Sequence, residues 1–166
     1  MSKTLILIRH AHRDNSRREI DNGLTEKGRE QAKNIKRFFS ERFTKEELAG
    51  GLWLVSSPKV RCMETLAPTA KFCDRPVDSH PDLDEQGAKE SSQAFLGRID
   101  HFLKEWMASK VGTTVVCSHG DWLPVATGRL LGLQHPFKKG GWLEIESLAG
   151  SSYLKWYVPT FRPFYN

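Results

Sequence analysis

The sequence predicts an α/β fold, a single-domain three-layer α/β/α sandwich with a mostly parallel central sheet. Three apolar runs, at residues 5–8, 52–55 and 113–117, each end in polar residues. Such continuous runs are typical of strands covered on both faces. Helical patterns lie between the runs, and strands that alternate with helices indicate a parallel sheet. No linker or internal repeat divides the chain, so residues 1–166 are expected to form one domain.

Three helices are expected between these strands. Thr25 is a good N-cap for a helix that runs to about Arg42. Ser57 is interpreted as an N-cap and Pro58 as the first residue of a helix towards Lys71. A third helix is predicted before the strand at 113–117 from apolar residues at helical spacing. The apolar stripes of the first and third helices are Ala32, Ile35, Phe38 and Phe39, and Phe95, Ile99, Phe102 and Trp106.

The remaining segments predict two strands and one long loop. Residues 142–145 and 153–158 are expected to pair around a turn at Gly150-Ser151-Ser152. Prolines and acidic residues between Cys73 and Lys89 indicate an irregular loop.

Composition excludes several classes of protein. Hydrophobic residues make up 39% of the chain and charged residues 27%, as in soluble globular proteins. No apolar run approaches the roughly 20 residues that span a membrane, and the amino terminus lacks a secretory signal. Three cysteines without paired spacing favour a reducing compartment, so the cytoplasm is expected. The net charge of +5 is interpreted as a solubility feature, with no nucleic acid as partner. The oligomeric state cannot be read from the sequence.

Arginines are concentrated after the first strand. Arg9, Arg13, Arg17 and Arg18 lie in one short segment, in which Asp14 is the only acidic residue. Their field would concentrate an anionic ligand. A solvated arginine-rich loop is an equally good interpretation.

Polar residues of unusual type follow all three predicted strands. The carboxyl ends of parallel strands lie at one edge of the sheet, where ligands bind in open α/β folds. Two histidines and two arginines, far apart in the sequence, should therefore converge there. The three groups are Arg9-His10-Ala11-His12, Ser56-Ser57-Pro58 with Arg61, and Ser118-His119-Gly120-Asp121.

Two guanidiniums and two imidazoles at one site suit a phosphate group. Each arginine can offer paired donors to phosphate oxygens. A neutral imidazole can attack phosphorus, provided that its other ring nitrogen is held, for example by a backbone carbonyl. A second, cationic histidine would stabilise charge on the transferring phosphoryl group.

The motifs resemble those of the histidine phosphatase superfamily, the phosphoglycerate mutase-like proteins. The resemblance runs in the family's order from about residue 5 to residue 130. The matching segments are Leu7-Ile8-Arg9-His10-Ala11, Leu24-Thr25-Glu26-Lys27-Gly28 with Gln31-Ala32, Ser56-Ser57-Pro58 with Arg61 and Glu64-Thr65, and Ser118-His119-Gly120.

The resemblance implies a metal-independent phosphatase without a cofactor. In it His10 is the nucleophile, and Arg9, Arg61 and His119 complete the phosphate pocket. Glu85 is the expected general acid, with Asp84 as its rival, and such an acid would need its pKa raised by partial burial.

Two departures from the family pattern matter. Ala11 replaces the usual glycine, which is tolerable unless that position needs a positive φ angle. The residues after Ala11 depart from the pattern of the mutases, which supplies one more side-chain contact to the phosphate. That contact is assigned here to Arg13 or Asn15, and no motif supports either residue.

The segment between Arg61 and His119 is short, so it has room for only a minimal lid over the site. In this the chain resembles the SixA-like phosphohistidine phosphatases, whose open sites admit phosphorylated proteins. The substrate is therefore expected to be a phosphoprotein or a small phosphate ester, and a phosphatase is expected rather than a mutase.

Two other classes of function are open. His10 and His12 have the spacing of two metal ligands, with Asp14, His119 or Asp121 as partners in a metallohydrolase. Arginines beside a divalent cation would oppose that arrangement electrostatically. The chain could also bind phosphorylated ligands without turning them over.

Overall fold

A six-stranded sheet forms the middle of the molecule, in the order β3-β2-β4-β1-β5-β6. The computed structural model describes residues 2–17 and 19–162. Strands β3, β2, β4 and β1 pair in parallel, whereas β5 and β6 pair antiparallel beside β1. The sheet is therefore mostly parallel, as predicted. The strands are β1 (Lys3–Arg9), β2 (Leu52–Ser56), β3 (Asp78–Ser79), β4 (Thr113–Ser118), β5 (Trp142–Leu148) and β6 (Ser151–Val158).

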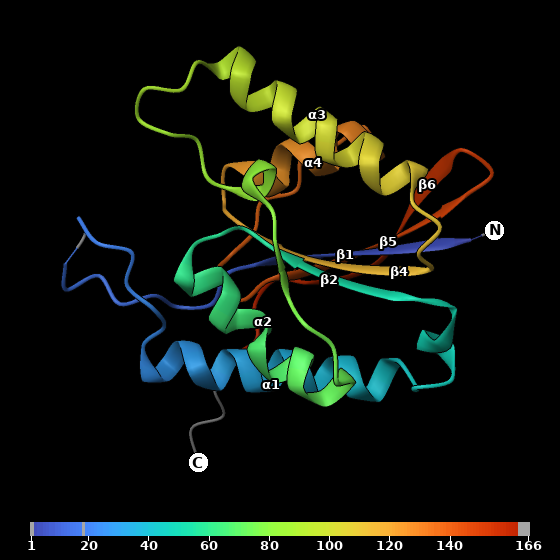
Figure 1. The fold of residues 1–166 in the computed structure, drawn as a ribbon, viewed down its shortest axis with the longest axis horizontal. Coiled ribbons are helices and arrows are strands. Elements are labelled where there is room, and N and C mark those ends of the chain that lie inside the picture. Colours follow the sequence, from blue (N-terminus) through green and yellow to red (C-terminus); the bar gives the residue numbers. More distant parts are fainter. Residues whose placement is uncertain (1, 18, 163–166) are drawn as a thin grey trace.

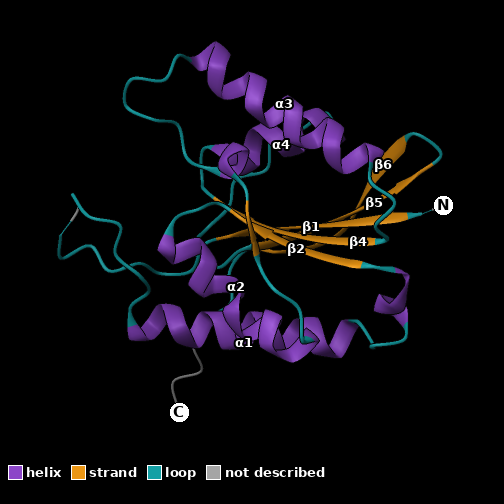
Figure 2. Cartoon of the chain, viewed as in Figure 1, coloured by secondary structure: helices purple, strands orange, loops and turns teal. Residues whose placement is uncertain are grey.

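Helices cover both faces of this sheet, which confirms the three-layer architecture (Figures 1 and 2). Helices α1 (Glu26–Arg42) and α2 (Val60–Cys73) lie on one face, and α3 (Ser92–Ala108) and α4 (Trp122–Leu131) lie on the other. In β1, Leu5 and Leu7 join the core beneath α3 and α4. Ile6 and Ile8 join the core beneath α1 and α2. The unbroken apolar run of β1 thus results from burial on two faces.

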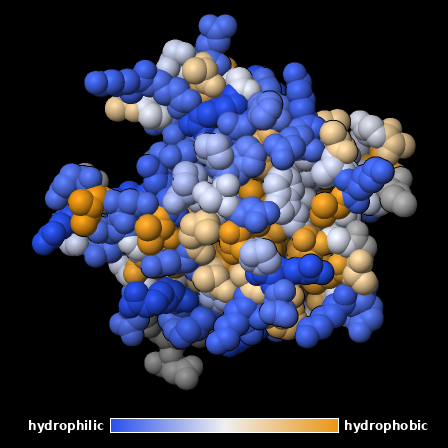
Figure 3. Space-filling model, in the orientation of Figure 1, coloured by the Kyte–Doolittle hydropathy of each residue, from blue (hydrophilic) through white to orange (hydrophobic). Residues whose placement is uncertain are grey.

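The surface agrees with this layering. In the view of Figure 3, the helical layers present mainly hydrophilic residues, and hydrophobic residues surface in the band between them. No helix in the described part of the chain is long and apolar enough to cross a membrane.

The start of α2 differs from the prediction. The helix begins at Val60 with Lys59 at its N-cap, so the assignment of Ser57 as N-cap and Pro58 as first helical residue was wrong. The Ser57 hydroxyl lies 2.8 Å from Nε2 of His119 and therefore serves another contact. The carboxylate of Asp21 accepts the Val60 N–H at 2.8 Å instead.

Two other segments differ from the prediction: one contains additional short elements, and the other turns at an earlier residue. The loop between Cys73 and Lys89 contains the short strand β3 and a 3₁₀ turn, Pro81–Leu83. The β5–β6 turn lies at Ala149 and Gly150, which both have positive φ, so Ser151 already belongs to β6.

Gly28 allows α1 to approach the segment that follows β1. The His12 carbonyl accepts the Thr25 N–H at 3.0 Å, and the Thr25 hydroxyl caps the helix by accepting the Gly28 N–H at 3.1 Å. A Cβ atom at residue 28 would overlap the His12 carbonyl oxygen, which is backbone and cannot swing away. A glycine is therefore required where helix and site segment meet.

We predict that Gly28→Ala lowers the free energy of unfolding by about 1–3 kcal/mol or more, because the new methyl group forces backbone apart. Gly97→Ala is the matched control, since Gly97 is exposed in α3 with no atom within 4 Å of its added Cβ. That change should raise stability by up to about 1 kcal/mol. Denaturant unfolding measures both, and equal effects of the two substitutions would contradict the role of Gly28.

Candidate active site

The carboxyl ends of β1, β2 and β4 meet at one edge of the sheet (Figure 1). Arg9 is in register with Ser118, and Ser56 with Cys117. The two histidines that follow β1 and β4, His10 and His119, have ring centroids 5.4 Å apart. Arg61 enters from α2, with Nη2 3.3 Å from Nδ1 of His119. The predicted convergence of distant strand ends is confirmed.

His10 is held as a neutral imidazole. Its Nδ1 lies 2.8 Å from the Ala11 carbonyl oxygen. Because a carbonyl only accepts, Nδ1 carries the proton and Nε2 has the free lone pair. Burial, aided by the charges of His119, Arg61 and Arg9, lowers the pKa of His10 to about 3, against the opposing effect of the Ala11 carbonyl. His10 is therefore a neutral imidazole, protonated on Nδ1 only, across the physiological range.

Ala11 occupies the position at which the family that the motifs resemble usually has glycine, and the backbone conformation there accepts it. It is buried and is not among the described residues with positive φ. Its N–H donates to Oγ1 of Thr65 at 3.0 Å, and the Thr65 hydroxyl donates to the Arg61 carbonyl at 2.7 Å. The alanine side chain thus causes no backbone strain, and the backbone N–H of residue 11 connects the site segment to α2.

Arg61 is only 2% exposed and is surrounded by acidic groups. Its Nη2 lies 2.7 Å from Oε1 of Glu85, and its Nη1 lies 3.3 Å from Oδ1 of Asp21. Asp21 also accepts the first N–H of α2, so this carboxylate fixes both the helix and the guanidinium. Sequence reasoning missed Asp21, because nothing in its neighbourhood indicates a contact across 40 residues.

His119 has the opposite protonation to His10. Its Nε2 lies 2.8 Å from Oγ of Ser57 and 3.4 Å from Oδ1 of Asp84. Burial is the largest single effect and favours the neutral form, but the Asp84 carboxylate and Cys62 together outweigh it, and the pKa of His119 rises to about 9. With both nitrogens protonated, Nδ1 of His119 and Nη2 of Arg61 are two donors that face one position.

The Glu85 carboxylate occupies that position. Oε1 contacts Arg61 at 2.7 Å and Oε2 lies 3.7 Å from Nδ1 of His119. Partial burial raises the pKa of Glu85, but the Arg61 guanidinium more than offsets this, and the pKa is lowered. The pKa of Asp84 is lowered to about 2, since contacts with His119 and Lys59 outweigh its burial. Neither carboxyl has the raised pKa expected of a general acid while the site is in this arrangement.

Arg9 lies against the loop after β4. Its Nη1 donates to the Phe137 carbonyl at 2.6 Å. A Cβ atom at Gly120 would lie 2.7 Å from Cζ of Arg9, so the glycine leaves room for the guanidinium. Burial lowers the pKa of Arg9, and Asp121 opposes that effect.

The other predicted site residues lie farther out. Arg13 pairs through its backbone with Leu24, and Asn15 is exposed and has no side-chain hydrogen bond within residues 2–17 and 19–162. Nδ1 of His12 lies 2.9 Å from Oγ1 of Thr25. Arg17 is exposed, whereas Arg18 lies outside the described residues. The same part of the chain contains no group of three or more His, Cys, Asp or Glu arranged to hold a metal ion.

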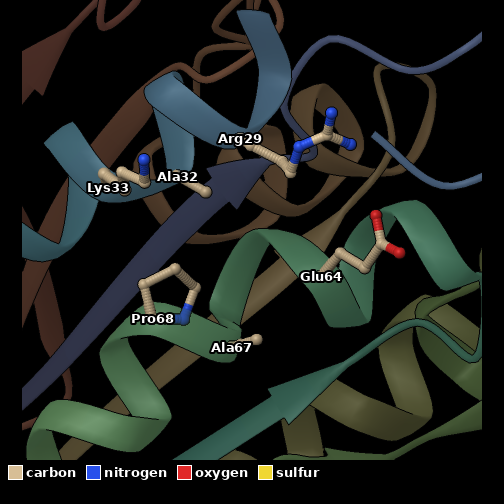
Figure 4. A pocket seen from close by; sticks show the side chains of 6 residues that line it. All are labelled: Arg29, Ala32, Lys33, Glu64, Ala67 and Pro68. Atoms are coloured by element: carbon tan, nitrogen blue, oxygen red, sulfur yellow. The ribbon is translucent and has the colours of Figure 1, made fainter. Parts of the chain in front are cut away.

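A separate pocket of about 330 Å³ lies between α1 and α2 and contains none of the predicted site residues (Figure 4). Glu64 points into it, yet its carboxylate also accepts the Leu24 N–H at 2.6 Å, a structural contact. The lining residues are Arg29, Ala32, Lys33, Glu64, Ala67 and Pro68.

Residues 5–89 match the family described as the histidine phosphatase superfamily (branch 1). A search of curated proteins found no match.

Solved structures with 16–20% identity share the fold. The α-ribazole phosphatase from Shigella flexneri is 20% identical with a TM-score of 0.75, over 92% of this chain and 94% of that one. Phosphoserine phosphatase from Entamoeba histolytica, in complex with phosphoserine, is 18% identical with a TM-score of 0.73, over 93% and 96%. The protein histidine phosphatase SixA, complexed with tungstate, is 16% identical with a TM-score of 0.73, over 94% and 96%.

We predict that Asp84→Asn lowers the pKa of His119 from about 9 towards or below its ordinary 6.5, because the carboxylate that opposes burial is removed. A raised pKa stabilises the folded state fully below about pH 6.5, and this contribution is lost as the pH rises through about 9. The variant should therefore lose stability mainly below pH 9. NMR titration of the imidazole measures the pKa directly.

Asp82→Asn is the control for this titration, because Asp82 pairs with the exposed His101 at 2.6 Å and lies only two residues before Asp84. It should leave the pKa of His119 unchanged. A pKa of His119 that stays near 9 in Asp84→Asn would refute the assignment of its cause.

Proposed function

This chain belongs to the histidine phosphatase superfamily and is a phosphatase, and from this we propose that it hydrolyses phosphate monoesters through a covalent phosphohistidine on His10, without a metal ion. The single observation that carries the proposal is the neutral His10 imidazole among cationic groups. Its Nδ1 is held by the Ala11 carbonyl, while Arg61 and His119 present donors nearby. We take residues 1–166 as one histidine phosphatase domain.

In the first step the substrate's phosphoryl group takes the position of the Glu85 carboxylate. Arg61, His119 and Arg9 then hold its oxygens and stabilise the charge that spreads over them. Nε2 of His10 forms a bond to phosphorus as the bond to the leaving oxygen breaks. The products are a phosphohistidine and an alcohol; with a phosphohistidine substrate the bond that breaks is P–N instead, and a neutral imidazole leaves.

Glu85 donates the proton to the leaving group. Its pKa is low because Arg61 contacts it directly. A bound phosphate would take over the guanidinium and bring negative charge beside the carboxyl, and both effects raise the pKa. Substrate binding itself would therefore convert Glu85 into an acid.

In the second step Glu85 accepts a proton from water, whose oxygen attacks phosphorus. The bond between phosphorus and Nε2 breaks, inorganic phosphate leaves, and His10 returns to its neutral form. Asp84 is less suited to this role, because it lies against Ser57, Lys59 and His119. We assign it to keeping His119 charged.

The absence of a helix between Asp84 and Ser91 supports a phosphorylated protein as substrate, including phosphohistidine as in SixA. The segments on either side of the site, between β1 and α1 and between Asp84 and Ser91, project past the strand ends (Figure 1). The second of them contains no helix that could cover the site. A small phosphate ester is the second candidate, favoured by cations beside the site that lack acidic partners.

Hydrolysis of p-nitrophenyl phosphate in the presence of a strong chelator tests the proposal. The wild-type protein should keep its activity, and His10→Ala should lose it by about 10³-fold or more, because the covalent route is removed. His101→Ala is the matched control, since His101 is an exposed histidine on α3 paired with Asp82.

Activity in His101→Ala should equal that of the wild type. Turnover that requires an added metal ion would favour the metallohydrolase. Binding of phosphate with no turnover over a broad pH range would favour a binding protein, and normal turnover by His10→Ala would exclude His10 as nucleophile.

A further inference from the structure

The cations around the site fall into two groups. Arg61 is paired with Asp21 and Glu85, and His119 with Asp84. In contrast, Arg13, Lys27 and Lys139 form no ion pair within the described residues. The phosphoryl group would use Arg61 and His119 together with Arg9, which also forms no ion pair in this part of the chain but donates to the Phe137 carbonyl. Arg13, Lys27 and Lys139 are left without an anion.

Lys139 is fixed directly beside His10 by its backbone. The N–H of the next residue, Gly140, donates to the carbonyls of Arg9 at 3.1 Å and His10 at 3.2 Å. The Lys139 carbonyl accepts from Oγ1 of Thr160 at 2.7 Å and from Nε2 of Gln31 at 3.2 Å.

Gln31 extends this connection to the first strand end. Its Oε1 accepts the His12 N–H at 2.8 Å, so one side chain joins the Lys139 loop to the segment that carries Arg13. His12 in turn is tied to α1, which carries Lys27, through Thr25. Three chain segments bearing unpaired cations are thus bonded together next to His10.

The charges act on one another. Burial lowers the pKa of Lys139, and Arg9, Arg13, Arg61 and Lys27 lower it further. Burial likewise lowers the pKa of His12, and Lys139 and Lys27 add to the effect. Lys139 is half-buried, whereas the neighbouring Lys138 is exposed. Like charges held together in this way are unfavourable until an anion binds between them.

We propose that Lys139, Lys27 and Arg13 form a second anion subsite beside the phosphate position. Within the second candidate class, the small phosphate esters, it selects those that carry a second anionic group, a carboxylate or a further phosphate, a few bonds from the scissile phosphoryl group. This inference rests on the proposed function, because it takes the first anion to be the phosphoryl group beside His10. The loop position of Lys139 makes it the main contact, with Lys27 and Arg13 at the rim.

Binding of phosphonates tests the subsite independently of turnover. Each ω-phosphonoalkanoate in a series of increasing chain length is compared by titration calorimetry with its neutral ω-amide. At one chain length the carboxylate should bind about tenfold tighter or more than the amide, as a hydrogen bond to a charged group allows. The advantage should shrink at high salt.

Two matched variants locate the effect. Lys139→Gln should reduce the preference to about twofold or less, and Lys138→Gln, which removes the same charge from the adjacent exposed residue, should keep it. Lys27→Gln, on the exposed start of α1, should reduce the preference in part, and it provides a second reading if Lys139→Gln folds poorly.

Equal binding of acid and amide at every chain length would overturn the subsite, as would an equal loss in Lys139→Gln and Lys138→Gln. Hydrolysis of p-nitrophenyl phosphate by the same preparation tests the proposed function separately. A preference without hydrolysis would leave the subsite standing and reject the phosphohistidine route. Hydrolysis without a preference would overturn the subsite and leave the phosphohistidine route standing.

Discussion

The buried guanidinium of Arg61 is the group around which the site is organised. A charge with 2% exposure is costly unless partners surround it, and here its two carboxylate partners come from separate segments. Asp21 approaches from the loop after β1 and Glu85 from the loop before α3. Asp84, just before Glu85, pairs with the neighbouring cation His119 at the end of β4. Because Asp21 also receives the first N–H of α2, the helix that carries Arg61 and the charge itself are fixed together.

The same field gives the two imidazoles opposite roles. His10 and His119 lie 5.4 Å apart, yet one is neutral and the other cationic. His10 has a carbonyl on Nδ1 and cations around it, and burial removes its charge. His119 has Asp84 near Nε2, which keeps its charge. A nucleophile and an electrostatic stabiliser thus arise from one residue type through their neighbours, which is the usual way in which a fold tunes acid and base groups.

Most elements of the fold could be predicted from local patterns, and the meeting of His10, Arg61 and His119 from the parallel arrangement of the strands, whereas α4 and β3 have no counterpart among the elements predicted by residue range. Apolar runs indicate buried strands, and parallel strand ends share an edge. The start of α2 could not be predicted, because Ser57 serves His119, a contact across 62 residues. Asp21 and Lys139 were missed for the same reason, since their contacts are set by packing between distant segments. The overlap that an alanine at position 28 would cause with His12 is equally invisible in the sequence.

The central claim is that His10 attacks through Nε2, because its Nδ1 proton is committed to the Ala11 carbonyl. NMR of the protein quenched during turnover, with the phosphorylated residue located by mass spectrometry, tests this most directly. The account predicts phosphate on Nε2 of His10. Phosphate on Nδ1, on another residue, or on no residue at all during turnover would contradict it.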